Sequence, residues 1–500
     1  MRFFLAIVLI LAGTEPVFAQ PKFTDDSGGL PQDHIYAGGW EHFVGGGVAV
    51  FDCNADQKPD LFAAGGEAPA SLIINTSDAG GAITFSSGNL PELRGVTGAY
   101  PIDIDSNGDI DLVVLRVGEN QILRGLGDCR FEPANELFAL PTRDAWTAAF
   151  AATWMKGEAL PTLAFGNYVD RFNAQGPFET CDTSEVIRPE GTKYHAIETI
   201  SPGYCALSML ISDWRRDGHP ELRVSNDRHY YVRGGYEQMF TLNPLKERDD
   251  WPHISLWGMG IASQDITGDG LPEVMTTSMG DQLLQFNRGD HFENAPFSIG
   301  TYAQRPFIGD DGRPATGWHA EFGDIDNDGR SDLFIAKGNV DQMPSNAMDD
   351  PNNLLMQQPD GTFLEAADRA GVASIARSRG AALADLNADG RLDIVVVNRR
   401  VPMEIWRNET KDTGNWAEID PIQSGVNWRS VGAFVELRTD TGTQSREVTV
   451  GGGHAGGQAI PQHFGLGKAI NAEARIIWPD GVAGEWISLP LNTRTEIRRD

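Results

Sequence analysis

The sequence predicts an all-β protein, a seven-bladed β-propeller followed by a small β-sandwich or β-barrel domain. Two observations support this prediction. An acidic nine-residue motif recurs at intervals of about 50 to 60 residues, between short segments rich in β-branched residues. Four short strands per period of this length, separated by turns, are typical of a propeller blade. Near residue 410 the repeats end, and a different alternation of apolar and polar residues begins.

The acidic motif occurs six times. Its copies are DCNADQKPD from Asp52, DIDSNGDID from Asp103, DWRRDGHPE from Asp213, DITGDGLPE from Asp265, DIDNDGRSD from Asp324 and DLNADGRLD from Asp385. The longest interval spans about two periods, and AFAATWMKGEALPTLAFGNY in its middle keeps the apolar, turn, apolar layout. Aligning Thr162 with Glu221 puts Trp154 at the place of the first Asp. We therefore count seven units, one of which has lost its acidic loop.

The seventh unit lacks the segment that forms the last strand of the others. Residues 21–30, PKFTDDSGGL, resemble the last-strand segment GTFLEAADRAGV of the sixth unit. We therefore expect the N-terminal segment to supply the outer strand of the seventh blade and so to close the ring. An open solenoid is the alternative, and it is less favoured because its two end repeats would expose unpaired edges.

The acidic motif predicts a calcium loop. Oxygen-bearing side chains at positions 1, 3, 5 and 9, with a backbone carbonyl at position 7, suit a hard cation, and Ca²⁺ better than Mg²⁺. Glycine at position 6 permits a left-handed turn. An EF-hand is excluded because it needs Glu at position 12, where this chain has Ala63, Val114, Val224, Thr276, Ile335 or Val396. The predicted ligands are Asp52, Asn54, Asp56, Asp60, Asp103, Asp105, Asn107, Asp111, Asp213, Asp217, Glu221, Asp265, Thr267, Asp269, Glu273, Asp324, Asp326, Asp328, Asp332, Asp385, Asn387, Asp389 and Asp393.

Three copies depart from the ideal pattern. Gln57 replaces the glycine of the first copy, Thr267 stands at position 3 of the Asp265 copy, and Arg215 stands at position 3 of the Asp213 copy. We expect a cationic side chain there to point away from a metal. The alternative interpretation is an ordinary acidic turn, since Asp and Asn are favoured in turns anyway. Six copies at blade spacing favour the metal loop, with a structural role in each blade.

Charge and the N-terminus indicate an exported protein that does not bind polyanions. The chain has 70 acidic and 40 basic residues, and its net charge of −30 opposes binding to nucleic acid or to anionic lipid. Residues 1–19 combine a basic start, a short apolar run and small residues, as in a cleaved signal peptide; an uncleaved anchor is the alternative. No later apolar run is long enough to cross a membrane. We expect a secreted or periplasmic protein.

The four cysteines permit two disulfides in an exported chain. Cys181 and Cys205 are the preferred pair because both lie in one insertion rich in Pro and Gly, which leaves Cys53 and Cys129 to pair by elimination. Their spacing is not that of a zinc site.

The loops DIDNDGRSD and DLNADGRLD, with the flanking NNLLMQQPDGTFLEAADRAGV, resemble FG-GAP/VCBS repeats, the calcium-loop blades of integrin α-chain propellers. The C-terminal segment, NWAEIDPIQSGVNWRSVGAFVELRTDTG and onward, resembles an ASPIC/UnbV domain, and the whole chain is similar to the cartilage acidic protein family, which has many exported bacterial members. The resemblance implies a propeller over residues 20–410 and a β domain over residues 411–500. The stretch GGGHAGGQ departs from the family pattern and puts a ligand site of the C-terminal domain in question.

Within the C-terminal domain, alternating segments such as AFVELRT and ARIIWPDG predict strands, and HFGLG predicts a tight turn. His454 and His463 flank a glycine-rich loop. A metal or catalytic role for them is one interpretation. The favoured alternative is that the glycines permit close approach of the backbone and the histidines are ordinary polar residues.

The sequence contains no nucleophile elbow, no zinc-protease motif and no phosphate-binding loop. Residues just before the acidic loops should line one mouth of the propeller channel, so His253, Trp257, Trp318 and His319 are candidates for a binding surface. Alternatively, the aromatic residues fill the wedges between blades. We expect a calcium-stabilised protein that binds or adheres to a protein, glycan or surface ligand. The other hypothesis is an exported hydrolase or lyase that acts on a polysaccharide or phosphoester at the channel mouth.

Overall fold

The computed structural model describes residues 20–174, 180–227, 234–302, 315–340 and 349–500. The predicted signal peptide, residues 1–19, lies outside this part of the chain. None of the described helices is long and apolar enough to cross a membrane. The short helices are η1 (Ser27–Gly29), η2 (Trp40–His42), α1 (Asn135–Phe138), η3 (Phe297–Ile299) and α3 (Ala367–Ala370).

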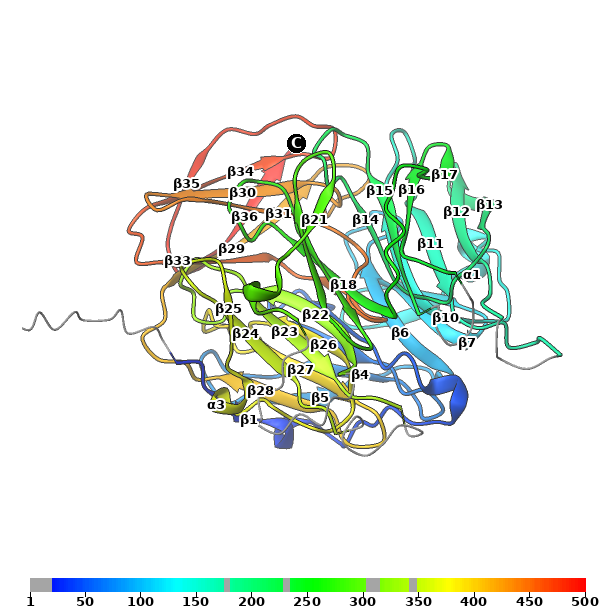
Figure 1. Ribbon diagram of the computed structural model, residues 1–500, viewed down its shortest axis with the longest axis horizontal. Coiled ribbons are helices and arrows are strands. Elements are labelled where there is room, and N and C mark those ends of the chain that lie inside the picture. Colours follow the sequence, from blue (N-terminus) through cyan, green and yellow to red (C-terminus); the bar gives the residue numbers. More distant parts are fainter. Residues whose placement is uncertain (1–19, 175–179, 228–233, 303–314, 341–348) are drawn as a thin grey trace, which may run out of the picture.

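The described strands before residue 410 form seven four-stranded antiparallel sheets, and the second and third sheets are also joined through β7 and β10. The first strands of the sheets pack side by side in a closed ring, β2 to β6 and so on through β26, which packs against β2 (Figure 1). This arrangement is a β-propeller, as the repeats predict. In order from the axis outward, the sheets are β2 (Val48–Phe51), β3 (Asp60–Ala63), β4 (Ser71–Asn75) and β5 (Phe85–Ser87); β6 (Val96–Ile102), β7 (Asp111–Gly118), β8 (Gln121–Gly125) and β9 (Phe131–Pro133); β10 (Ala145–Thr153), β11 (Thr162–Asn167), β12 (Ser184–Glu190) and β13 (Lys193–Ile200); β14 (Ala206–Ser212), β15 (Glu221–Asn226), β16 (Gln238–Leu242) and β17 (Leu245–Glu247); β18 (Gly258–Gln264), β19 (Glu273–Ser278), β20 (Leu283–Asn287) and β21 (Phe292–Asn294); β22 (Gly317–Gly323), β23 (Asp332–Lys337), β24 (Asn353–Gln357) and β25 (Phe363–Glu365); and β26 (Ser378–Ala384), β27 (Asp393–Asn398), β28 (Glu404–Asn408) and β1 (Phe23–Asp25).

The N-terminal strand closes the ring. β1 pairs antiparallel with β28, and Phe23 lies opposite Asn408. The backbone N–H of Asp26 donates to the carbonyl of Ile405 at 2.9 Å, and its carboxylate pairs with Arg407 at 2.7 Å. The prediction that the N-terminal segment supplies the outer strand of the seventh sheet is therefore confirmed.

Neighbouring sheets are linked at the acidic loops. The side-chain amide of Asn408, at the end of β28, donates to the carbonyl of Ile325, the second residue of the preceding acidic loop, at 2.9 Å. Asn75, Asn287 and Gln357 make the same bond to Leu386, Trp214 and Ile266. Between the first and second sheets, the backbone N–H of Cys129 makes this bond to Cys53, and a disulfide joins the two residues. Both predicted disulfides, Cys53–Cys129 and Cys181–Cys205, are present.

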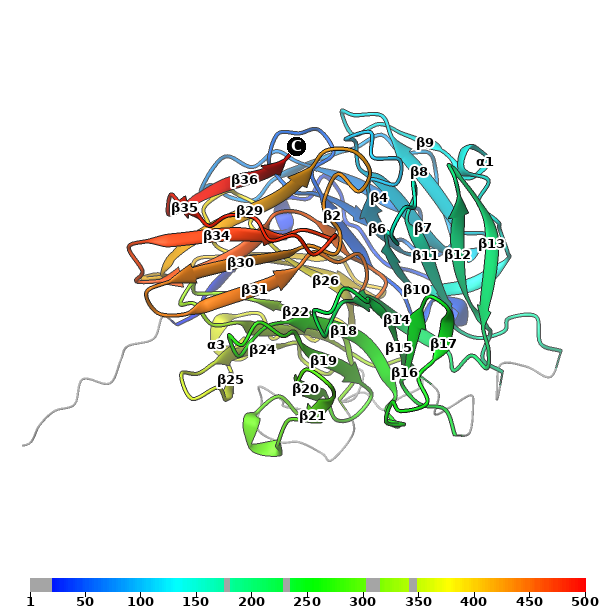
Figure 2. The same ribbon diagram turned by 90° about the horizontal axis from the view of Figure 1, so that it is seen from above.

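The C-terminal domain is a small β-sandwich. One sheet contains β33 (Gln462–Gly467), β29 (Asn415–Gln423) and β36 (Thr493–Arg499), and the other contains β31 (Thr443–Glu447), β30 (Phe434–Thr439), β34 (Ala472–Ile477) and β35 (Ile487–Leu489) (Figure 2). Ile419, Val435 and Phe464 are buried between the two sheets. The segment HFGLG lies within β33, so the prediction of a tight turn there is wrong: His463, Phe464, Gly465 and Gly467 lie in register with β29, with one irregularity at Leu466.

One segment of the C-terminal domain, residues 450–458, enters the propeller and fills its axis; we call it the axial segment. Its last residue begins β32 (Gln458–Ala459), which pairs parallel with β2. Hydrogen bonds join it to every first strand of the ring: Val450 O to Ala152 N (2.9 Å), Gly452 N to Met209 O (2.6 Å), Gly452 O to Tyr100 Oη (3.0 Å), Gly453 N to Ile261 O (2.7 Å), His454 N to His319 Nδ1 (3.0 Å), Ala455 O to Ala99 N (3.1 Å), Gly457 O to Val50 N (3.1 Å) and Gln458 Nε2 to Leu383 O (3.3 Å).

Glycine is required on both sides of this contact. A Cβ atom at Gly456 would lie 2.3 Å from the Val48 carbonyl oxygen, and one at Gly47 or Gly98 would lie 1.8 or 1.7 Å from that of Ala455. The structure confirms the favoured interpretation of the glycine-rich loop, which is that its glycines permit close approach of the backbone.

The other end of the axis is filled by side chains. Trp146, Tyr168, Met259 and Trp318 belong to one buried cluster near the beginnings of the first strands, and the half-buried Trp257 packs against them. Trp146 and Tyr168 meet edge to face, with 4.9 Å between their ring centroids. The channel thus holds the axial segment at one end and an aromatic cluster at the other.

Candidate functional site

Each acidic loop connects the first strand of a sheet to the second. In the Asp324 loop the ladder ends with Gly323 opposite Asp332, so the eight residues between them form the turn. The Asp324 carboxylate accepts the backbone N–H groups of Asp328 (2.9 Å) and Gly329 (2.7 Å). The same two bonds recur at Asp103, Asp213 and Asp385, so the first aspartate organises the turn from within.

Two positions of every loop are left-handed. At position 6 the glycines have φ values such as +93° at Gly329 and +81° at Gly390, as predicted, and Gln57, which replaces the glycine in the first loop, has φ +68°. Position 4 is also left-handed, which the sequence analysis missed. The residues there are Ala55, Ser106, Arg216, Gly268, Asn327 and Ala388. Gly268 and Asn327, which tolerate this conformation, were the only signal for it in the sequence.

The carboxylate at position 9 links the acidic loop to the second and third strands of the sheet. The Asp332 carboxylate accepts the backbone N–H of Ile325 in the loop (2.9 Å) and that of Gln357 in β24 (2.8 Å). Asp60, Asp111 and Asp393 make the equivalent pair of bonds. A metal ion at position 9 would therefore act on the register of the whole sheet.

The loops concentrate buried carboxylates. One oxygen each of Asp324, Asp326 and Asp332 lies within 4.8 Å of the others, and the same holds for Asp103, Asp105 and Asp111. Burial, with neighbouring carboxylates adding to it, raises the pKa of Asp324 to about 8 and that of Asp111 to about 8. Arg124 pairs with Asp105 at 2.8 Å, and Arg446 and Arg330 act on Asp324, yet the two pKa values stay raised. Buried carboxylates are costly unless they are protonated or paired with a cation.

Position 3 carries the clearest sign of a missing partner. The side-chain oxygens Asp105 Oδ1, Asp326 Oδ1 and Asn387 Oδ1 are buried, and none has a hydrogen-bond partner among the described residues. Glu273 Oε1, at position 9 of the Asp265 loop, is in the same state. Since buried polar atoms are nearly always satisfied, these oxygens fit the coordination shell of a hard cation such as Ca²⁺.

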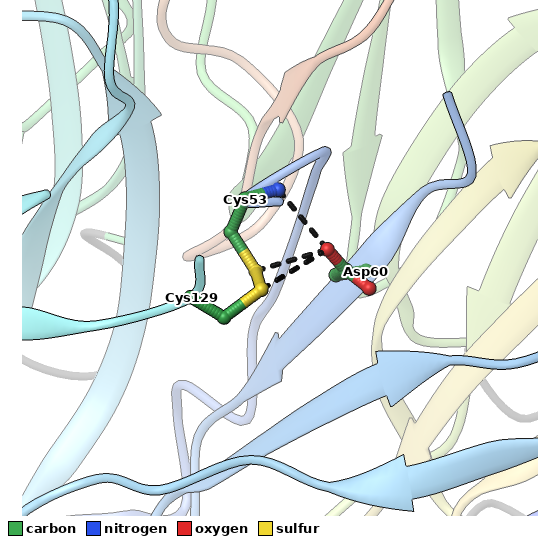
Figure 3. A group of neighbouring side chains, drawn as sticks. All are labelled: Cys53, Asp60 and Cys129. Atoms are coloured by element: carbon green, nitrogen blue, oxygen red, sulfur yellow. Dashed lines mark hydrogen bonds between the residues drawn. A yellow bond between two sulfur atoms is a disulfide. The ribbon is translucent and has the colours of Figure 1, made fainter. Parts of the chain in front are cut away.

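The first loop differs because a disulfide lies beside it. The sulfur atoms of Cys53 and Cys129 lie against Asp60, whose carboxylate also accepts the backbone N–H of Cys53 at 3.0 Å (Figure 3). Burial raises the pKa of Asp60 to about 7. Because both cysteines are in the disulfide, they are not available as metal ligands.

Two turns are closed by side chains instead. In the third sheet, Glu158 accepts the backbone N–H of Met155 at 3.0 Å and the hydroxyl of Thr162 at 2.9 Å. Thr162 lies opposite Thr153, the register that the alignment with Glu221 predicts.

In the Asp213 loop, the Arg215 guanidinium points inward and bridges Asp217 (3.0 Å) and Glu221 (3.2 Å). We expected a cationic side chain here to point away from a bound metal; in this loop the guanidinium points inward, because the two carboxylates attract it. Glu221 is also bound by Arg248 at 2.9 Å and by the Trp214 indole at 2.7 Å. A guanidinium thus bridges carboxylates that the other loops would offer to an ion, and a metal site at Asp213, Asp217 and Glu221 stays a prediction.

The four residues considered for a binding surface lie in different surroundings. Trp318 is 2% exposed, and its indole donates to the Gly338 carbonyl; it shares the aromatic cluster with Trp257. His319 is 4% exposed and accepts the N–H of His454 in the axial segment. His253 is exposed and stacks on Tyr236, with 3.7 Å between ring centroids. The structure brings Trp257 and Trp318 together but not all four residues, and a ligand-binding role for them stays a prediction.

Comparisons with known proteins agree with the repeat assignment. A family model described as FG-GAP-like repeat matches residues 52–114, 265–335 and 324–396, and a model described as ASPIC and UnbV matches residues 423–500. Cartilage acidic protein 1 of Homo sapiens is 30% identical over 110 residues, and that of Xenopus tropicalis is 36% identical over 110 residues. Both alignments cover 21% of this chain, and the chain spans only 16% and 17% of the length of these relatives.

Solved structures give weaker likenesses. A BBS1N chain crystallised in complex with ARL6DN has a TM-score of 0.45 and 11% identity, over 75% of this chain and 94% of that chain. Sqt1 of Saccharomyces cerevisiae has a TM-score of 0.42 and 11% identity, over 78% and 99%. These scores are too low to carry an argument about fold or function. The two family models, in agreement with the loop geometry and the strand topology, show that this chain contains FG-GAP-like repeats and a C-terminal ASPIC and UnbV domain, and about a fifth of it is similar to cartilage acidic protein 1.

Proposed function

We propose that this protein is an exported, calcium-stabilised binding or adhesion protein, with a propeller over residues 20–410 and a β domain over residues 411–500, that recognises a protein, glycan or surface ligand. The observation that carries the calcium assignment is the unpartnered buried oxygen at position 3 of the loops at Asp103, Asp324 and Asp385. The two disulfides support export, because such bonds persist in oxidising compartments.

The ions would be structural. Residues at positions 1, 3, 5 and 9 of the loops at Asp52, Asp103, Asp265, Asp324 and Asp385 would hold them, and the position 9 carboxylate would pass the effect to the third strand of each sheet. Calcium supplies the positive charge that offsets the crowded carboxylates. The ligand would then be recognised by surfaces that the stiffened sheets hold in place.

Calcium titration tests the proposal. We expect the wild-type protein, after dialysis against a chelator, to bind several Ca²⁺ ions in calorimetry and to gain several degrees in melting temperature when calcium returns. Asp326→Ala should lose one of the bound ions, while Asp78→Ala, a change at an exposed aspartate outside the loops, should keep all of them. An unchanged melting curve after verified removal of calcium would contradict a stabilising role.

A further inference from the structure

A large cleft lies between the propeller and the C-terminal domain, on the side of the third and fourth sheets. Its volume is about 1080 Å³. The turn 154–158 of the third sheet forms one wall, the Asp213 loop forms the floor, and residues of β29, β31 and β36 with their adjoining turns form the other wall. Clefts at domain interfaces are preferred places for ligands, and a volume of this order accommodates a sizeable small molecule.

The cleft lies where the repeat is interrupted. Trp154 lines it at the position where six units have an aspartate, and Met155 follows. The indole N–H of Trp154 is buried and has no hydrogen-bond partner among the described residues. Since Glu158 and Arg215 close the two adjoining turns, no ion is required there and the wall is partly aromatic. The cleft is thus separate from the calcium loops.

The charge of the lining is negative. Its carboxylates are Glu158, Asp213, Asp217, Glu447, Asp480 and Asp500, and its cations are Lys156, Arg216 and Arg499. Two of the cations are already paired, Arg216 with Glu436 at 2.5 Å and Arg499 with Asp480 at 2.6 Å. An anionic ligand would therefore meet mostly like charge.

Two carboxylates in the floor, Asp213 and Glu447, form no direct ion pair among the described residues; Arg216, which is paired with Glu436, acts on Glu447 from a greater distance. The Glu447 side chain, from β31, accepts the backbone N–H of Asp213 at 2.8 Å and the hydroxyl of Ser212 at 2.5 Å, which brings the end of β31 onto the Asp213 loop. Neither Glu447 nor Asp213 has an ion-pair partner among the described residues. The ammonium groups of a ligand would form ion pairs with Glu447 and Asp213, and its methylene groups would contact Trp154 and Met155.

We propose that this cleft binds an organic cation with several amino groups, of the polyamine class, through Asp213 and Glu447. The inference rests on the proposed binding function, because it names a site and a ligand class for it. It does not depend on the calcium loops, so calcium binding at Asp324 and amine binding at Glu447 are measured separately.

The test is calorimetry with spermidine as the probe, on the calcium-loaded full chain. We expect one saturable site in the wild-type protein. Glu447→Gln keeps the shape of the side chain and an acceptor for Asp213 but removes the charge, and it should weaken spermidine binding by about tenfold or more. Glu136→Gln, at an exposed carboxylate on α1, is the matched control and should leave affinity unchanged. Both variants should keep wild-type calcium binding.

A second variant tests the proposal independently, in case Glu447→Gln does not fold. Ser424→Lys adds an ammonium group at an exposed position of the cleft rim, and it should also weaken spermidine binding. Three results would overturn the proposal: no saturable spermidine site, equal affinity in the wild-type and Glu447→Gln proteins, or displacement of spermidine by stoichiometric Ca²⁺, which would make this a metal site. Loss of calcium binding at the Asp324 loop with spermidine binding intact would overturn only the proposed calcium role.

Discussion

The backbone N–H of His454 donates a hydrogen bond to Nδ1 of His319 at 3.0 Å, in the middle of the propeller. His454 belongs to the C-terminal domain and His319 to β22 of the sixth sheet. Nε2 of His454 accepts the backbone N–H of Gly45, which precedes β2 of the first sheet, at 3.0 Å. One residue of the C-terminal domain therefore joins the sixth sheet to the segment before the first sheet, so the two domains are expected to unfold as one unit.

Gly456→Ala should destabilise the whole protein. The new Cβ would lie 2.3 Å from the carbonyl oxygen of Val48, so the axial segment or β2 must move, and such overpacking costs about 1–3 kcal/mol or more. Gly442→Ala, in the same domain but with open space around it, is the control. Thermal denaturation followed separately by signals from each domain checks the result, and a lowered melting temperature for the C-terminal domain alone would contradict the coupling.

His454 should make stability depend on pH. Burial, and next the positive charge of Arg379, lowers its pKa to about 3, against 6.5 in the unfolded chain. Below pH 6.5 His454 becomes protonated in the unfolded state but stays neutral in the folded state. The free energy of unfolding therefore decreases as the pH falls from about 6.5 to about 3. At pH 5 the protonation of His454 in the unfolded state lowers the free energy of unfolding by about 2 kcal/mol. Other groups titrate in this range, so the measurement is the difference between wild type and His454→Gln in denaturant unfolding at pH 7 and pH 5. Equal pH dependence in the two proteins would show that His454 contributes nothing.

Gly329→Ala tests the left-handed position of the loops. Its φ of +93° is one that an L-residue adopts with strain, while no neighbouring atom approaches closely. We expect a loss of about 1–2 kcal/mol in stability and weaker binding of one calcium ion. Gly28→Ala, where φ is ordinary and the space is open, should change neither quantity. Calcium-dependent unfolding curves of the two variants provide the comparison.

Arg215→Asp should convert the guanidinium-closed turn into a calcium loop. The change gives the loop Asp213, Asp217 and Glu221 a fourth carboxylate at position 3 and removes the cation that now bridges two of them. Without calcium the variant should be less stable than wild type, because four carboxylates repel one another. With calcium it should bind one ion more than wild type in equilibrium dialysis. An unchanged number of bound ions would mean that Arg248, which also holds Glu221, is enough to exclude the metal.

The sequence predicted the parts of this structure that depend on local spacing. The loops follow from residues within nine positions, and β1 follows from its likeness to the segment around Phe363. The axial segment could not be predicted, because glycine-rich backbone has no periodicity and its partners come from seven strands far apart in the chain. Gly47 and Gly98 were a signal in the sequence, because glycine is needed there only if another backbone segment packs against these strands at the axis. His319 was expected at an open channel mouth for the same reason.

The direction of Arg215 also lay beyond sequence reasoning. Local repulsion from a bound cation was assumed, whereas the outcome depends on Arg248 from the end of the same sheet and on Trp214, which together fix Glu221 in the turn. The disulfide between Cys53 and Cys129 was reached by elimination. The structure shows what this disulfide does: it links two neighbouring sheets at the place where the amides of Asn75 and Asn408 link other pairs of sheets.

The closure of the ring by β1 has a consequence for the order of synthesis. Phe23 is synthesised before its partner Asn408, which follows 385 positions later, and the axial segment follows later still. β1 therefore has no partner strand until β28 has been made, and the axis stays empty until residues 450–458 have been made. Contacts of such long range slow folding and leave intermediates open to aggregation. Truncation near the C-terminus should therefore weaken the pairing of β1 with β28. A partner that covers the unpaired strand edge during synthesis would raise the yield of folded protein.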